Sequence, residues 1–122
     1  MPIKGSCHCG KIAYTLDEES PAEALECNCS ICRRKGYLHH FSTADRFTLE
    51  ASRDDIIVYT FNKHNIRHQF CKTCGCAPFA EGTGPDGKAM VEINLRCAED
   101  LDLDSLTINQ FDGAHKIPGP TS

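Results

Sequence analysis

The chain has 122 residues, 40% of them hydrophobic, which is the length of one ordinary domain that can bury a core without covalent cross-links. Its 13 basic and 17 acidic residues give a formal charge of −4, which argues against a nucleic-acid surface because such surfaces normally carry a basic excess. No run approaches the roughly 18 apolar residues of a membrane helix, and the chain opens without a signal-peptide hydrophobic region, so we expect a cytoplasmic protein without membrane contact.

Short alternating runs between turn signals predict a mainly β fold of short antiparallel strands. In chain order, residues 12–16 form the first predicted strand, directly after a pair of cysteines. Ser30 to Lys35 is predicted as a helical turn, because Ser30 can cap it. Residues 47–49 indicate another short strand before a turn. We expect a single domain over residues 1–122, with a core from about residue 3 to residue 112.

A predicted hairpin occupies the middle of the chain. Residues 57–61 and 66–70 alternate on either side of a turn from Asn62 to Asn65, and the second strand leads into Cys71. The glycine-rich segment from Gly82 to Gly87 is predicted as a loop. Residues 91–95 and 107–111 are the last predicted strands, and the tail from Ile117 is expected to fray.

Cysteines are the most informative residues of this chain. Seven of the nine fall into three short clusters, at residues 7–9, 27–32 and 71–74, and such clusters are typical of zinc sites. Spacings of C-x-C and C-x-x-C let neighbouring sulfurs bind one ion at about 2.3 Å. The first and third clusters together make a closed set of four ligands for a structural ion, Cys7, Cys9, Cys71 and Cys74. The middle cluster offers three ligands and leaves one position free for water or substrate, as catalytic zinc requires: Cys27, Cys29 and Cys32.

Two other uses of the cysteines are less favoured. A disulfide framework is disfavoured because the number of cysteines is odd, and because partners two residues apart are poorly placed for an unstrained bridge. A thioredoxin-like redox pair at Cys29 and Cys32, or at Cys71 and Cys74, lacks the surrounding βαβ pattern. Gly10 and Gly75 directly follow cysteines, where a metal-binding turn often needs a positive φ, and they favour zinc.

Four segments carry a family pattern: Gly5-Ser6-Cys7-His8-Cys9-Gly10, Cys27-Asn28-Cys29-Ser30-Ile31-Cys32-Arg33-Arg34, Phe70-Cys71-Lys72-Thr73-Cys74-Gly75 and Ile93-Asn94-Leu95-Arg96-Cys97. In this order they resemble the motifs of the glutathione-dependent formaldehyde-activating enzyme (Gfa) family, whose domain also occurs in centromere protein V. The resemblance implies an Mss4-like, or β-tent, zinc-binding fold with two zinc ions per chain. It also implies the same division into a structural site of four cysteines and a catalytic site of three.

The activity that gives the family its name joins formaldehyde to glutathione as S-hydroxymethylglutathione, which is a carbon–sulfur lyase reaction read in reverse. The resemblance therefore implies a zinc-dependent lyase that acts on glutathione or another small thiol adduct. Arg33 and Arg34 directly follow the third ligand, and we interpret them as contacts for the carboxylates of such a thiol. A solvated basic face that includes Lys35 is the alternative. The chain is shorter than the founding members of the family, which carry extra segments.

The remaining cysteines and two histidines have open roles. Cys76 is interpreted as a buried free thiol or a spare ligand, and Cys97 as structural. His39 and His40 follow the catalytic trio, and in a strand only one of them could face it, as an acid–base group or as a structural histidine. A noncatalytic zinc module that binds a protein or nucleic acid is the alternative to an enzyme, with the charge balance against nucleic acid and the open three-cysteine site in favour of catalysis.

Overall fold

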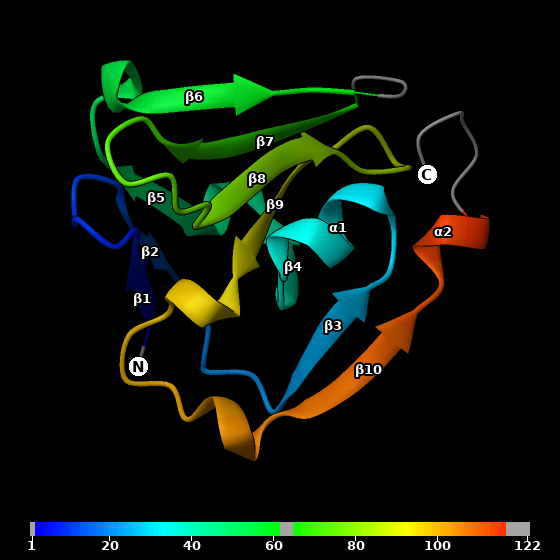
Figure 1. Cartoon of the computed structure of the whole chain (residues 1–122). Helices are drawn as coiled ribbons and strands as arrows, with labels where there is room; N and C mark the ends of the chain where they lie inside the picture. The colour runs from blue at the N-terminus through cyan, green and yellow to red at the C-terminus, as the bar shows by residue number, and fades with distance from the viewer. Residues whose placement is uncertain (1, 62–64, 117–122) are drawn as a thin grey trace.

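A computed structural model describes residues 2–61 and 65–116 of the chain. Within this part short strands dominate and form two sheets (Figure 1). The strands are β1 (Ile3–Ser6), β2 (Ala13–Leu16), β3 (Glu23–Cys27), β4 (His39–Thr43), β5 (Phe47–Glu50), β6 (Ile56–Tyr59), β7 (Ile66–Cys71), β8 (Phe79–Thr83), β9 (Ala89–Asn94) and β10 (Thr107–Phe111). The predicted mainly β fold is therefore confirmed.

The helices are short. They are α1 (Ser30–Lys35), α2 (Gly113–Lys116) and the 3-10 turns η1 (Ala44–Arg46), η2 (Arg53–Asp55), η3 (Leu95–Cys97) and η4 (Leu103–Ser105). Helix α1 has the predicted bounds, but Cys29 holds the N-cap position and Ser30 is the first helical residue, so the expected capping role of Ser30 was wrong. Across residues 2–61 and 65–116, no helix has the length and apolar character to cross a bilayer.

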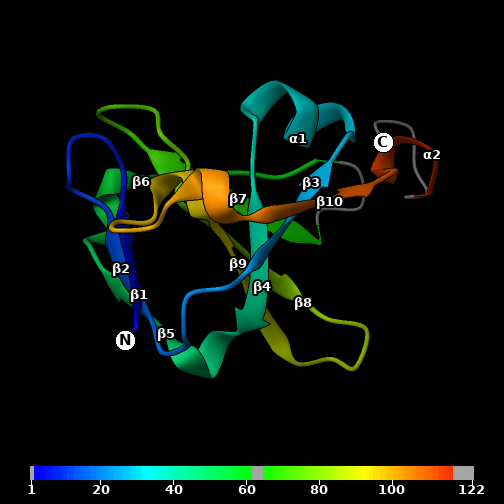
Figure 2. The same cartoon turned by 90° about the horizontal axis from the view of Figure 1, so that it is seen from below.

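A three-stranded sheet has the order β1-β2-β5, and a seven-stranded sheet has the order β10-β3-β4-β9-β8-β7-β6. Neighbouring strands pair antiparallel as predicted, except that β10 runs parallel to β3, with Thr107 opposite Glu23. Figure 2 shows these two strands side by side. The prediction of antiparallel strands is corrected for this pair, whose long connection through most of the fold is what a parallel arrangement requires.

Most predicted strands are present with shifted ends. The expected loop from Gly82 was placed too early, because Gly82 and Thr83 still pair with β9. Leu95, expected on the last residue of a strand, begins η3 instead. The predicted turn from Asn62 to Asn65 and the tail from Ile117 lie wholly or mostly outside the described residues.

The main apolar core lies between the two sheets and has β2 at its centre. Ile12, Tyr14 and Leu16 are each at most 1% exposed, so the alternation seen in the sequence marks the buried face. Other members of this core are Ile3, Ala24, Leu38, Phe79, Val91, Ile93, Leu95 and Leu106. A second, smaller cluster surrounds the middle group of cysteines, with Tyr37 and Ala77. The molecule thus provides two separate apolar settings for its cysteines.

A close contact between β1 and β2 predicts a sensitive position in the main core. A side chain at Gly5 would meet the ring of Tyr14 at well under 3 Å, and Tyr14 is buried and cannot move aside freely. We expect Gly5→Ala to destabilise the fold by about 1–3 kcal/mol, as overpacked cores do. The midpoint of urea unfolding measures this, with Lys4→Ala on the exposed face of β1 as the control. Equal midpoints for the two variants would contradict the expected clash.

Candidate metal centres

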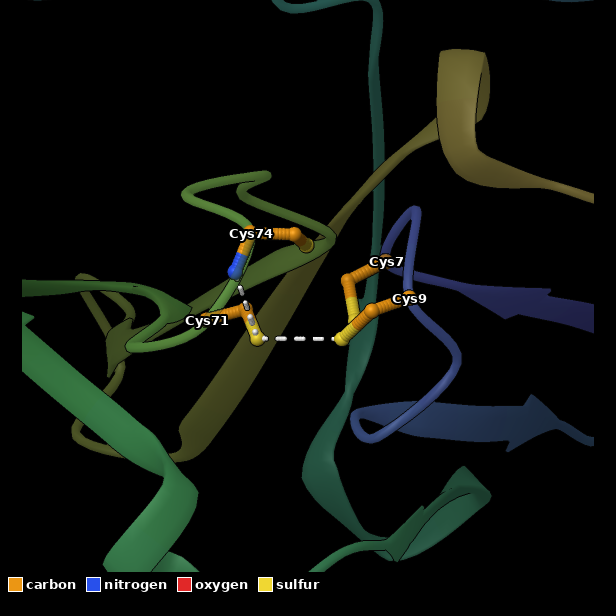
Figure 3. A group of neighbouring side chains, drawn as sticks. All are labelled: Cys7, Cys9, Cys71 and Cys74. Carbon is orange, nitrogen blue, oxygen red and sulfur yellow. Dashed lines mark hydrogen bonds between the residues drawn. The ribbon is translucent and has the colours of Figure 1, made fainter.

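The first and third cysteine clusters meet in space. Cys7 and Cys9 come from the loop after β1, and Cys71 and Cys74 from the end of β7 and the turn that follows (Figure 3). Their four sulfur atoms all lie within 4.8 Å of one another. The Sγ atom of Cys9 is 3.6 Å from that of Cys7 and 3.6 Å from that of Cys71.

These separations fit a shared ion. Four sulfurs placed tetrahedrally at 2.3 Å from zinc are about 3.8 Å apart, whereas a disulfide joins its sulfurs at about 2.05 Å. All nine cysteines of the chain are free thiols. The four-cysteine group predicted from spacing could therefore hold a metal, and the disulfide alternative has no support in the structure.

Backbone N–H groups donate hydrogen bonds to sulfur atoms in both halves of this group, and such bonds stabilise thiolates. The N–H of Ile12 donates to the Sγ of Cys7 at 3.3 Å, and the N–H groups of Thr73 and Cys74 donate to the Sγ of Cys71 at 3.3 and 3.4 Å. Gly10 and Gly75 allow these turns, with φ of 85° and 80°. The positive φ values expected after the cysteines are thus confirmed.

Backbone amides also favour thiolates over thiols at Cys71 and Cys74. The backbone N–H of Cys76, followed by that of Cys9, lowers the pKa of Cys74 to about 5. The backbone N–H of Cys74 is the largest of the causes that lower the pKa of Cys71. Because metals bind thiolates, this part of the group is ready for a cation near neutral pH.

The middle cysteine cluster forms the second group. Cys27 ends β3, Cys29 caps α1, and Cys32 lies in the first turn of that helix. All three side chains are buried, and their sulfurs lie within 4.8 Å of one another. The helix turn brings them together, because the N–H of Arg33 bonds the carbonyl of Cys29 at 3.0 Å and starts the turn. The trio predicted from spacing could therefore also hold a metal.

The thiol pKa values of the three cysteines are shifted in different directions. Burial raises the pKa of Cys29, but hydrogen bonds from the backbone N–H of Cys32, from the thiols of Cys32 and Cys27 and from the backbone N–H of Ile31 together outweigh it and lower the pKa overall. Burial raises the pKa values of Cys27 and Cys32. A buried set of three thiols is costly to ionise without a cation, and a cation supplies the charge that offsets this cost.

His39 lies directly against the trio. Its Nε2 atom is 3.2 Å from the Sγ of Cys32, its Nδ1 atom is 3.2 Å from a carboxylate oxygen of Glu92, and its side chain is 5% exposed. His40 points to the other face of β4 and contacts Glu18 at 2.8 Å. The expectation that only one of the two histidines faces the trio is confirmed. Glu92 was not among the sequence candidates, because its contact depends on the pairing of β4 with β9.

A cavity of about 200 Å³ opens beside the trio. Its walls are mainly apolar and aromatic, and among the described residues that line it the ionisable groups besides the cysteines are His39, His68 and Glu92. Among its lining residues are Leu25, Ile31, Phe41, Phe61, Ile66 and Phe111. A buried group of thiols at the edge of an apolar cavity resembles the setting of a small-molecule site more than that of a purely structural one.

The basic residues that follow the trio line a second, larger hollow beside α1, which shares Ile31, Phe61 and His68 with the first cavity. Arg33, Arg34 and Lys35 lie there in a space of about 810 Å³. The guanidinium of Arg34 donates to the carbonyl of Ser30 at 2.8 Å, and the ammonium of Lys35 lies 4.7 Å from the ring centre of Phe70. These contacts hold two of the positive charges beside α1, one against its first residue and one over Phe70.

Cys76 and Cys97 belong to neither group. The carbonyl of Cys76 accepts the N–H of Cys71 at 2.9 Å, and its side chain packs partly buried against the main core. Cys97 lies in η3, where burial raises its thiol pKa to about 11. Their positions agree with the free-thiol reading of Cys76 and the structural reading of Cys97.

Comparison with known proteins bears on this arrangement. The sequence model described as "Glutathione-dependent formaldehyde-activating enzyme" (GFA) matches residues 2–107. The chain belongs to the GFA family. The crystal structure of a Rhodobacter sphaeroides protein, solved in a structural genomics programme, is 24% identical and has a TM-score of 0.76. The alignment covers 88% of this chain and 99% of that one. This likeness supports the fold, and the family match agrees with the resemblance seen in the cysteine motifs.

Proposed function

We propose that this GFA-family protein is a zinc-dependent carbon–sulfur lyase that acts on small thiol adducts such as S-hydroxymethylglutathione. The observation that carries the proposal is the buried trio of Cys27, Cys29 and Cys32 beside an apolar cavity, separate from a complete four-cysteine group. A second group that lacks a fourth cysteine and faces a cavity is what a catalytic zinc site needs. Nine free thiols suit the reducing cytoplasm, where we place the protein.

The proposal includes two zinc ions per chain. Cys7, Cys9, Cys71 and Cys74 would hold the structural ion, and Cys27, Cys29 and Cys32 the catalytic ion. The sulfur spacing of the first group and the burial of the second support this division. Metal analysis is expected to find two zincs per chain, and an anomalous scattering map is expected to place one in each group. Density in only one group would overturn the two-site assignment.

The proposed cleavage breaks the carbon–sulfur bond of the adduct. The electron pair of that bond stays on the sulfur, the adduct hydroxyl loses its proton as its oxygen forms the carbonyl of formaldehyde, and the sulfur is released as thiolate or thiol. Bound zinc would act as a Lewis acid and offer a position for the leaving sulfur. The largely apolar walls of the cavity limit the polar contacts open to the released aldehyde, and the three cysteines fix the place where sulfur must lie.

Arg33 and Arg34 are proposed to bind the carboxylates of the thiol. Three thiolates and one zinc have a formal charge of −1, which a fourth thiolate raises to −2, so positive neighbours would also offset charge. Because hydrogen bonds to charged groups contribute about 1.5–3 kcal/mol, we expect the Arg33→Ala/Arg34→Ala variant to bind glutathione roughly 10–100-fold more weakly. Calorimetry measures this, with zinc content as the check that the site remains intact. Unchanged glutathione affinity would leave these arginines as a solvated surface.

Lys4→Ala/Lys11→Ala is a suitable control for loss of positive charge, because neither lysine lines the cavity or the hollow beside α1. The control is expected to bind glutathione as the unaltered protein does. A salt-dependent gel shift with nucleic acid would instead favour the noncatalytic alternative. We propose a small thiol, with no nucleic-acid partner, in agreement with the formal charge of −4.

A further inference from the structure

We propose that His39 is the fourth protein ligand of the ion held by Cys27, Cys29 and Cys32, and that an incoming thiol takes its place. The inference rests on the proposed metal role of this trio. It changes the expected vacant position into one that is filled by a neutral, exchangeable ligand. Three features of the structure support it: the distance from His39 to the trio, the partner of its second ring nitrogen, and the packing that fixes its ring.

The distance is suited to a shared ion. The Nε2 atom of His39 lies 3.2 Å from the Sγ of Cys32. Sulfur at 2.3 Å and nitrogen at 2.0–2.1 Å on one tetrahedral zinc are about 3.6 Å apart, so the distance to Cys32 is close to what a shared ion requires. The ring nitrogens of His39 do not lie within 4.8 Å of all three sulfurs, so the imidazole must turn further toward the trio to complete the set. The imidazole is buried, and it faces the same cavity as the three cysteines.

The second nitrogen of the ring has the partner that zinc-bound histidines normally have. Glu92 lies 3.2 Å from Nδ1 and is itself only 13% exposed. Histidines that bind zinc almost always donate their other N–H to a carboxylate, a carbonyl or water, which fixes the tautomer and makes the metal-facing nitrogen a better donor. Glu92 would thus keep the proton on Nδ1 and leave Nε2 free for the ion.

The sheet holds this pair in place. Phe41 is directly opposite Glu92 in the pairing of β4 with β9, which puts His39 and Glu92 on the same face two residues apart in register. The rings of Tyr37 and Phe41 lie 5.3 and 5.7 Å from the imidazole. Val91 and Ile93, which flank Glu92 in sequence, point into the main core and anchor β9. A largely buried carboxylate is costly without a partner, and the imidazole of His39 is such a partner for Glu92.

The proposal has a consequence for binding of the thiol. With His39 bound, the trio site has four protein ligands and needs no water, and a thiolate enters by replacing the neutral imidazole. The displaced ring keeps its contact with Glu92 and stays beside the cavity. This arrangement would hold the ion when no substrate is present, which a site of three ligands does less well.

Cobalt-substituted protein tests the proposal without reference to activity. The absorption of Co²⁺ at the trio is obtained by subtracting the spectrum of Cys29→Ser, which retains only the four-cysteine group. We expect His39→Ala to shift the ligand-field bands of the trio site and to weaken its cobalt affinity at least about tenfold, with added imidazole restoring the spectrum. Glu92→Gln should weaken affinity about 10–100-fold. His40→Ala, a change of the neighbouring residue on the other face, should leave both readouts unchanged.

A measurement on the unaltered zinc protein decides the matter if His39→Ala does not fold. X-ray absorption at the zinc edge should show one imidazole among seven sulfur ligands in the two-zinc protein. An unchanged spectrum and affinity in His39→Ala, or absence of the imidazole signal from the unaltered protein, would overturn the proposal. Neither result would contradict the lyase proposal, because that proposal is tested separately by the release of formaldehyde from S-hydroxymethylglutathione.

Discussion

Replacing Cys71 by serine is expected to remove one of two bound metal ions and most of the stability of the fold. Cys71 ends β7 and joins the group contributed by the loop after β1, so its sulfur would link the two sheets through a bound ion. Structural zinc contributes roughly 10 kcal/mol or more in small zinc peptides, whereas a whole domain is stable by about 5–15 kcal/mol. Circular dichroism with and without a chelator, together with zinc content, measures both effects.

The matched control for this prediction is Cys76→Ser. Cys76 follows closely in sequence and also packs against the main core, but its sulfur lies outside the metal group. It is expected to keep two zincs and to lose no more than about 1–2 kcal/mol, as ordinary point mutants do. If Cys71→Ser kept both its metal content and its unfolding midpoint, the four-cysteine group would have no structural role.

The sequence predicted the strands in which apolar and polar residues alternate strongly. It did not predict the strands whose burial depends on contacts with neighbouring strands. Residues 12–16 alternate large apolar side chains, and β2 follows them. β1 contains Lys4 and Gly5, and its glycine is explained only by the ring of Tyr14 on the neighbouring strand. β3 and β4 contain Glu23 and His39 to Ser42, and such polar strands depend on cross-strand contacts that no single segment reveals.

The candidate site shows the same division. The two cysteine groups could be predicted because ligand spacing within each cluster is a local property, and the structure brings together the same seven residues. The contact between His39 and Glu92 could not be predicted, since it depends on the register of β4 with β9, which are separated by 45 residues of other structure. The adjacent histidines indicated that one imidazole could lie near the trio. Which of the two does so depends on which face of β4 is turned toward the cysteines.

Replacing Cys29 by serine is expected to abolish lyase activity while leaving the fold intact. Cys29 is the trio member whose pKa is lowered overall, by hydrogen bonds from backbone amides at the start of α1 and from the thiols of Cys32 and Cys27, so it is the one best prepared to hold a cation. Serine keeps the N-cap position but is a poor zinc ligand. Loss of Lewis-acid assistance worth several kcal/mol corresponds to a rate decrease of at least about 100-fold. Release of formaldehyde from S-hydroxymethylglutathione measures the rate.

Cys97→Ser is the control for loss of a buried thiol, because Cys97 is partly buried and outside both metal groups. It should release formaldehyde at the rate of the unaltered protein. Cys29→Ser should still contain one zinc and unfold as a cooperative domain, because the four-cysteine group lies in a different apolar cluster from the trio. Equal rates for Cys29→Ser and the unaltered protein would remove the lyase proposal and favour a noncatalytic zinc module, since the trio would then hold its ion for structure or partner binding alone.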